Sequence, residues 1–410
     1  MNFINAEIVK HCLANTPQIT FEITEKCNLS CSYCGYGKIY NNKDPRSNRS
    51  LRPKDAYAFL MYIKGLWETG YSTTGDDIIY ISFYGGEPLL NMDFIQSCVS
   101  YIEEHLCGFN KTFVFSLTTN ALLLPKYMDY FAEKNFRLLI SLDGDEQGSS
   151  YRQYHTEKPA FKDIVAAVNK LREKYPIYYK DCVNFNSVLS NRSTVESINR
   201  FILLEFGKVP SISEINDTGI NPDYKDEFMA MYRNKEDSMV RVNKMDNFLN
   251  DPRFDGIARY MQMHSPFFYL GYEELFFGKK QRKFIPTGTC LPFGKKVFIT
   301  VGGKIMPCER IGYQYYLGMV KDGEINIDFE AIAQKYNEYY TRAEKNCQCC
   351  ADRRTCLCCM FNNGIVDNRK DKCSYFVTQT EADVRSRDVE DFFMIYPEAY
   401  SYIQKYYETI

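Results

Sequence analysis

Three cysteines, Cys27, Cys31 and Cys34, lie together in the stretch EITEKCNLSCSYCGYG, directly after an apolar, strand-like segment. A loop of this kind can bring three thiolates to one metal centre. A structural zinc site uses four protein ligands, but the next cysteine, Cys98, lies over sixty residues further along the chain. The local set therefore leaves one position open, as in an iron–sulfur cluster that keeps one iron free for chemistry. Buried or zinc-binding cysteines are the alternative interpretation.

A second segment that could do chemistry, YGGEP, follows the strand-like sequence DIIYISF. Its glycines, Gly85 and Gly86, let the main chain approach a ligand closely, and Glu87 offers a negative charge to an ammonium group. A Gly-Gly pair also occurs in ordinary turns. Its position after an intact cysteine triplet favours the functional interpretation.

The motif CNLSCSYC resembles the cluster motif of the radical SAM superfamily, in which the open iron chelates the amino and carboxylate groups of S-adenosylmethionine (SAM). The resemblance implies a 4Fe–4S cluster on the three cysteines, with Tyr33 near the adenine. YGGEP is similar to the family's GGEP element, which implies that Gly85, Gly86 and Glu87 meet the methionine amino group. Other matches to SAM-binding positions of the family are Asn120 in TTN, Ser141 in SLDG and Arg152 in SSYRQYH.

These last positions hold the ribose and carboxylate of SAM in the family. A bidentate arginine–carboxylate fork is the physical reason to prefer Arg152 over other arginines. A solvated arginine is the alternative.

A second set of cysteines occupies the C-terminal part of the chain. Cys290, Gly303 and Cys308 follow the spacing C-x12-G-x4-C, with VFITVGGKIMPC typical of a hairpin around the glycines. The remaining members are Cys347, Cys350, Cys356, Cys359 and Cys373. A zinc ribbon, which C-x2-C pairs often form, is the alternative to iron–sulfur clusters.

These spacings resemble the SPASM domain, an extension of radical SAM enzymes that carries auxiliary clusters. The resemblance implies a distal 4Fe–4S cluster on Cys347, Cys350, Cys356 and Cys373. It implies a proximal one on Cys290, Cys308 and Cys359. The sequence departs from the pattern because Met360 stands where the family has a cysteine, so Cys359 or Cys358 must serve, and we favour Cys359.

With three thiolates, the proximal cluster can keep an iron open to substrate. Cys349 and Cys358 are then surplus, either structural or reactive thiols. Glu309 follows Cys308 at the place where sulfatase-maturating relatives carry a catalytic aspartate. It is therefore our candidate base, although it could instead pair with Arg310 or Lys304.

The bulk composition excludes several classes of protein. With 410 residues, 45% of them hydrophobic, and a formal net charge of −2, the chain is globular, large enough for two domains, and has no electrostatic footprint for nucleic acid. It contains no apolar run near the roughly 18 residues of a membrane span. The N-terminus does not match a secretory signal, so we expect a cytoplasmic protein whose sixteen cysteines serve metals, not disulfides.

Strand-like and helix-like segments alternate six times in the first half of the chain. Expected strands cover 19–24, 77–86, 112–120, 137–144, 180–190 and 211–217, with amphipathic helices between them. This alternation predicts an α/β fold, a partial (β/α)6 barrel of the TIM type. Loops at the carboxyl ends of such strands carry the chemistry, and the cysteine triplet, Gly85–Glu87, Asn120 and Asp143 all follow predicted strands.

We expect four parts in the chain. They are a radical SAM partial barrel (1–220), a bridge region (221–285), a small SPASM domain with a β-hairpin (286–376) and a C-terminal helical segment (377–410). The cluster motif begins at residue 27, so we expect no winged leader-binding module before it; another protein or the bridge region would recognise a leader peptide.

The resemblance implies reductive cleavage of SAM to a 5′-deoxyadenosyl radical, which abstracts a hydrogen from a peptide or protein. The leading hypothesis is a maturase that installs a thioether or carbon–carbon crosslink in a ribosomally synthesised peptide. The alternative is an anaerobic sulfatase-maturating enzyme that makes formylglycine, which Glu309 in place of aspartate disfavours. A non-catalytic iron–sulfur partner is the third hypothesis. Either enzyme needs a low-potential electron donor such as flavodoxin or ferredoxin.

Overall fold

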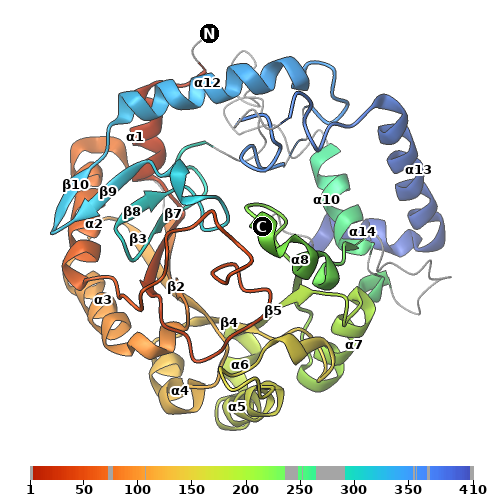
Figure 1. Ribbon diagram of the computed structural model, residues 1–410, viewed down its shortest axis with the longest axis horizontal. Helices are drawn as coiled ribbons and strands as arrows, with labels where there is room; N and C mark the ends of the chain where they lie inside the picture. The colour runs from red at the N-terminus through yellow and green to blue at the C-terminus, as the bar shows by residue number, and fades with distance from the viewer. Residues whose placement is uncertain are drawn as a thin grey trace. The chain divides into compact units, whose positions relative to one another are not determined.

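The computed structural model forms two compact units (Figure 1). The barrel unit comprises Ala6–Ser238 and Leu291–Ile332, and the cysteine-rich unit comprises Met1–Asn5, Met239–Cys290 and Ala333–Ile410. The structure describes residues 3–72, 77–106, 108–235, 248–251, 253–264, 291–353, 356, 358–366 and 370–406. Within these ranges no helix has the length and apolar character needed to cross a bilayer.

The barrel unit is built on a ten-stranded sheet in which six strands, β1 to β6, lie parallel and in chain order. Their bounds are Gln18–Thr24, Asp77–Gly85, Lys111–Thr119, Arg137–Ser141, Val183–Leu189 and Ser211–Glu214. This order confirms the six strands and the partial-barrel architecture expected from the sequence. Parallel neighbours in chain order need a crossover after each strand, and helices supply them.

Four further strands continue the sheet beyond β1. β7 runs parallel to β1, and β8, β9 and β10 follow antiparallel. Their bounds are Val297–Ile299, Lys304–Met306, Gly318–Lys321 and Glu324–Asn326. The expected hairpin around Gly303 is therefore confirmed as β7–β8, whereas β9 and β10 were not expected because each is only three or four residues long. Gly303 is needed at its turn, since an added Cβ would lie 1.9 Å from the Val320 carbonyl oxygen.

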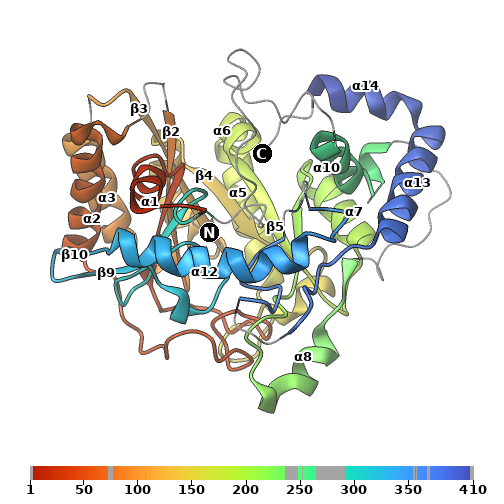
Figure 2. The ribbon, with the colours of Figure 1, turned by 90° about the horizontal axis from the view of Figure 1, so that it is seen from above.

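Helices cover the outer face of the parallel strands, and α2 and α3 lie side by side there (Figure 2). The helices of the barrel unit are α1 Ala6–Ala14, α2 Pro53–Leu66, α3 Met92–His105, α4 Leu124–Glu133, α5 Phe161–Lys174, α6 Pro176–Cys182, α7 Val195–Phe206 and α8 Lys225–Met231. The predicted helix 161–174 is confirmed with the same bounds, because its apolar positions recur at helical spacing. α1 and α6 were not expected.

The core of the barrel unit lies between the sheet and its helices. Side chains alternate between the two faces of a strand, so Ile19, Phe21 and Ile23 of β1 pack toward the helices and are at most 1% exposed. The ring of Phe21 lies 6.4 Å from that of Phe94 in α3. The alternate positions of β1, including Thr20 and Glu22, are polar and also buried. They face the side of the sheet where the functional residues collect.

The helices of the cysteine-rich unit pack through aromatic side chains. α10 (Phe254–His264), α13 (Gln379–Ile395) and α14 (Pro397–Tyr406) share a cluster that includes Ala258, Phe392 and Tyr396. α13 begins with a capping box, in which Thr378 accepts from Glu381 N while the Glu381 carboxylate accepts from Thr378 N. The expected C-terminal helices are thus present. α12 (Phe329–Cys347), which begins in the barrel unit, was not expected.

Candidate metal centre

The cysteine triplet occupies the loop that follows β1, and all three thiols are half-buried. The pKa of Cys27 is raised to about 11 and that of Cys31 to about 12, chiefly by burial and in small part by the neighbouring Cys34. Leu29 N donates to Cys27 Sγ at 3.4 Å, and Cys34 N donates to the Cys31 carbonyl at 3.1 Å. The three thiols therefore share one small region, and Cys27 and Cys31 retain their protons until a metal displaces them.

The glycines of YGGEP fit against the backbone of this loop. Gly86 N donates to Thr24 O at 2.9 Å, and Glu87 N donates to Lys26 O at 2.8 Å. A Cβ on Gly86 would lie 2.1 Å from Lys26 O, and one on Gly85, whose φ is 140°, would lie 2.3 Å from Thr24 O. The glycines thus allow two backbone segments to meet, a role that the sequence interpretation, which weighed a ligand contact against an ordinary turn, had missed.

Glu87 joins the ends of β2 and β3. Its carboxylate accepts from Leu89 N at 3.1 Å, Thr119 Oγ1 at 2.7 Å and Asn120 N at 2.8 Å. The side chain is 1% exposed, and burial outweighs these donors and raises its pKa to about 7. All three donors are neutral, so the predicted contact of Glu87 with the ammonium group of SAM stays a prediction.

Asn120 and Ser141 lie at the ends of β3 and β4. Asn120 Nδ2 donates to Asn28 Oδ1 in the cysteine loop at 2.7 Å, and Asn120 Oδ1 accepts from Leu122 N at 3.1 Å. Ser141 is the last residue of its strand, is half-buried and pairs in register with Asn186. The structure therefore ties Asn120 to the cysteine loop directly and places Ser141 at the same edge of the sheet.

Arg152 and Tyr33 meet at Asp143, two residues beyond β4. Arg152 donates from Nε and Nη2 to the two Asp143 oxygens, both at 2.9 Å, and the Tyr33 hydroxyl donates to Asp143 Oδ2. Asp143 Oδ1 also accepts from Val188 N at 2.8 Å. The sequence interpretation placed Asp143 at the rim but missed it as the partner of Arg152. Its position in SLDG, directly after a strand, was the available signal.

The segment that carries Arg152 is hydrogen-bonded to the cysteine loop. Ser30 N donates to Gln153 O at 2.7 Å, and Ser32 N donates to Tyr151 O at 3.2 Å. His155 Nε2 lies 2.9 Å from Cys27 O. Residues 151–155 therefore form one wall of the loop that holds the triplet.

Glu309 pairs with Lys296, not with the two partners considered from the sequence. Lys296 Nζ lies 3.2 Å from each Glu309 oxygen, whereas Lys304 pairs with Asp44 at 2.7 Å. Burial is the largest single influence and would raise the pKa of Glu309, but Lys296, the backbone and Arg310 together outweigh it, so the pKa lies below its ordinary value. The carboxylate is therefore ionised and, next to Cys308, able to accept a proton.

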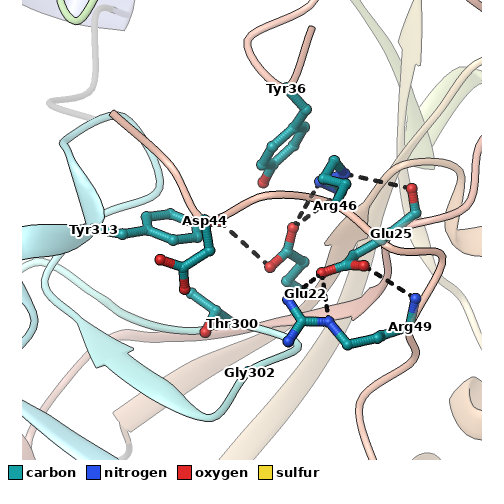
Figure 3. Close-up of a pocket in the computed structure, with 9 residues that line it drawn as sticks. All are labelled: Glu22, Glu25, Tyr36, Asp44, Arg46, Arg49, Thr300, Gly302 and Tyr313. Carbon is teal, nitrogen blue, oxygen red and sulfur yellow. Dashed lines mark hydrogen bonds and ion pairs between the residues drawn. The ribbon is translucent and has the colours of Figure 1, made fainter. Parts of the chain in front are cut away.

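A network of ion pairs links β1, which precedes the cysteine loop, to the segment that follows this loop (Figure 3). Arg46 donates from both terminal nitrogens to Glu22 Oε1 at 3.1 Å, and Glu22 Oε2 accepts from Val301 N at 3.1 Å. Glu25 accepts from Arg49 Nη2 at 2.7 Å. The network joins β1 and the segment after the cysteine loop to the β7–β8 turn.

The cysteine-rich unit gathers a second group of thiols. The pKa of Cys347 is raised to about 12, first by burial and then by Cys356, Cys373 and Cys350. A hydrogen bond with Cys356 raises the pKa of Cys358, and Cys373 raises it further. Cys358 therefore lies with the predicted distal set. Of the predicted proximal set, Cys290 falls outside the described residues, Cys308 belongs to the barrel unit and Cys359 to the cysteine-rich unit.

The thiols of the cysteine loop fit an iron–sulfur cluster. Within the described ranges no three His, Cys, Asp or Glu side chains converge as one metal ion requires. A single zinc draws its ligands to about 2.0–2.3 Å, whereas a cubane cluster takes each thiolate on a different iron and so accepts wider spacing. The three half-buried thiols of the loop, with no fourth cysteine near them in sequence, match a cluster that keeps one iron open.

Comparison with known proteins finds a family match within the first half of the chain. Residues 21–204 match the Radical SAM superfamily. The chain is 26% identical over 344 residues to the radical SAM cyclopropyl synthase TigE of Paramaledivibacter caminithermalis, covering 81% of this chain and 64% of TigE. It is 23% identical over 314 residues to the cysteine-type anaerobic sulfatase-maturating enzyme of Clostridium novyi, covering 73% of this chain and 75% of that enzyme. The chain thus spans less than two thirds of TigE.

A solved structure shares the fold. Native anSMEcpe with bound AdoMet superposes with a TM-score of 0.59 and 18% identity, covering 95% of this chain and 99% of that chain. At this identity the likeness concerns the fold alone. It agrees with the partial barrel built by β1 to β6.

Proposed function

Residues 21–204 form a radical SAM domain, and from this premise we propose that the protein is a maturase that introduces a crosslink, thioether or carbon–carbon, into a ribosomally synthesised peptide. The observation that carries the proposal is the meeting, in the barrel unit, of three thiols with Gly86, Glu87 and the Arg152 segment around one loop. The similarity to the anaerobic sulfatase-maturating enzyme of Clostridium novyi, whose name gives a protein as its target, supports a peptide or protein as substrate.

Cys27, Cys31 and Cys34 hold a 4Fe–4S cluster in this proposal. When bound, the cluster would supply the electron for reductive cleavage of SAM, and this chemistry would allow a hydrogen to be taken from the peptide. The protein's own groups bind and orient SAM: Tyr33 beside the adenine, the Gly85–Glu87 backbone at the amino group, and Asn120 and Ser141 at the ribose. The Arg152 guanidinium binds the carboxylate.

Two auxiliary 4Fe–4S clusters complete the proposed set. Cys347, Cys350, Cys356 and Cys373 hold the distal cluster, and Cys290, Cys308 and Cys359 hold the proximal one. The position of Cys358 beside Cys356 supports Cys359 as the proximal ligand. Crosslinking would remove two hydrogens from the peptide, one as the hydrogen atom that deoxyadenosine carries away and one as a proton and an electron. Glu309 would accept the proton, and an auxiliary cluster held by the second set of cysteines would take up the electron. A flavodoxin or ferredoxin in the cytoplasm supplies the reducing electron.

Formylglycine formation is the second candidate, and the match to the Clostridium novyi enzyme over 73% of this chain favours it. The two functions differ in what happens to the peptide. A crosslink costs two hydrogens and joins two residues, whereas formylglycine replaces one cysteine or serine side chain by an aldehyde.

Anaerobically reconstituted protein, SAM, dithionite and candidate peptides from neighbouring genes test the proposal. We expect 5′-deoxyadenosine and a peptide that has lost two hydrogens, with fragmentation blocked between the joined residues. An aldehyde that reacts with a hydrazide probe would establish the second candidate instead. Absence of deoxyadenosine from the iron-loaded protein would refute both.

A further inference from the structure

We propose that Asp143 is a positioning residue, which holds one edge of the Arg152 guanidinium so that the opposite edge meets the carboxylate of SAM. The inference rests on the proposed function, because it concerns how that function binds its co-substrate. It is carried by the hydrogen bonds of one buried carboxylate and by the place of the Arg152 segment.

The Asp143 carboxylate is fully buried and its acceptor sites are taken by the protein. It accepts both Arg152 bonds at 2.9 Å, the Val188 amide at 2.8 Å and the Tyr33 hydroxyl. An ionised carboxylate offers about four lone-pair sites, so these four donors saturate it. Asp143 therefore has no capacity left for a ligand and acts only through its neighbours.

Arg152, unlike Asp143, still has hydrogen-bonding groups that the described residues do not use. A guanidinium carries five N–H groups and presents two edges on which a carboxylate can bind in a bidentate manner. Asp143 occupies the Nε and Nη2 edge. In the part of the chain that the structure describes, neither Nη1 nor the second Nη2 hydrogen has a hydrogen-bond acceptor. The edge formed by Nη1 and Nη2 is thus left for a second carboxylate.

The backbone places Arg152 at the cysteine loop. Tyr151 O and Gln153 O, on either side of Arg152, accept from Ser32 N and Ser30 N, on either side of Cys31. Arg152 therefore stands opposite Cys31, and its charge acts on that thiol. A ligand bound at an open iron of the triplet would lie next to the free edge of the guanidinium.

Asp143 also stops the guanidinium from turning. Arg152 is 7% exposed and lies over the Tyr33 ring, with Cζ 5.6 Å from the ring centroid. Two bonds to a saturated carboxylate fix the plane of the guanidinium against this ring. Without them the arginine keeps its charge but loses the orientation that a bidentate contact needs.

Asp143→Asn in the full-length, iron-loaded protein tests the inference, with SAM and decarboxylated SAM as the two probes. We expect full iron content, a Kd for SAM about tenfold higher, and a Kd for decarboxylated SAM changed less than about twofold. The matched control is Asp55→Asn. Asp55 is 4% exposed, pairs with Arg52 at 2.7 Å and accepts from Gly323 N at 2.8 Å, away from the triplet. Its loss should leave both Kd values unchanged.

Several results would overturn the inference. An unchanged Kd for SAM, an equal rise for both probes, or loss of iron from the triplet would each assign Asp143 another role. If Asp143→Asn does not fold, Tyr33→Phe decides: it removes one of the four donors and should raise the Kd for SAM about two- to threefold, but not that for decarboxylated SAM. If the wild-type protein itself does not bind SAM, the proposed function fails as well.

Discussion

Lys296 Nζ contacts both carboxylate oxygens of Glu309 at 3.2 Å, directly beside Cys308. A lysine in this position keeps the carboxylate ionised and holds it in one orientation. Lys43 Nζ also donates to the Glu309 carbonyl, at 2.5 Å, so two cations fix this residue. The Lys296–Glu309 ion pair keeps the candidate base ionised. Replacing Lys296 therefore tests whether Glu309 acts as the base.

Lys296→Met should move the acid limb of the pH–rate profile for peptide modification to higher pH. Lys296 is the main group that lowers the pKa of Glu309, so its removal lets burial raise that pKa. A base works when deprotonated, and activity would then be lost at a higher pH than in the wild type. Lys304→Met, which breaks a pair with Asp44 instead, is the control. A profile that Glu309→Gln leaves intact would exclude Glu309 as the base.

Replacing Cys27, Cys31 and Cys34 by alanine should remove one cluster of three. Iron should fall from about twelve to about eight per chain, and SAM cleavage should stop. Iron analysis and chromatography of 5′-deoxyadenosine measure both. Deoxyadenosine from the variant would remove the triplet from the proposed chemistry, and four irons with zinc in the wild type would contradict the auxiliary clusters.

Gly86→Ala should disturb the cysteine loop. Its Cβ would lie 2.1 Å from Lys26 O, a backbone atom that cannot turn aside, so the loop must shift and the triplet should lose iron. Gly65→Ala in α2 is the matched control, because its Cβ meets nothing within 4 Å. That change should stabilise the helix by about 0.5–1 kcal/mol. Full iron content in Gly86→Ala would show that the loop tolerates the displacement.

Glu87 should make stability depend on pH. Its pKa of about 7 lies above the ordinary carboxyl value of 4.5, so the folded state binds more protons than the unfolded state between these values. Stability should therefore fall as pH rises from about 4.5 to 7, by roughly 3 kcal/mol at most. Glu87→Gln should abolish this slope in urea unfolding experiments at several pH values. The same slope in the variant would place the titrating group elsewhere.

Cys358→Ala and Cys359→Ala should show which of the two cysteines is a ligand of the proximal auxiliary cluster. Cys359→Ala should remove about four irons, because this thiol closes the proposed proximal set, whereas Cys358→Ala should leave all clusters in place. Iron content and EPR spectra of the reduced protein compare the two. Loss of a cluster in Cys358→Ala alone would make Cys358 the proximal ligand and Cys359 the surplus thiol.

The sequence predicted the elements whose residues repeat at a regular spacing. Apolar periodicity defined α5 with the bounds found in the structure, and alternation defined the six parallel strands. α12 carried a comparable signal, with Ile332, Tyr336 and Tyr340 buried at intervals of four residues. Short strands such as β10 carry no periodic sequence signal, because three residues cannot display a period.

In the candidate site, too, the sequence determined some features and the tertiary structure the others. Sequence alone determined the three thiols of the loop and the motifs that meet it, because local spacing within one loop limits where its side chains can lie. Only the tertiary structure decided the partners: Asp143 for Arg152, Lys296 for Glu309, and the Lys26 carbonyl for Gly86. Each of these contacts depends on how strands and loops are packed, and local spacing along a chain does not specify which polar groups become buried together.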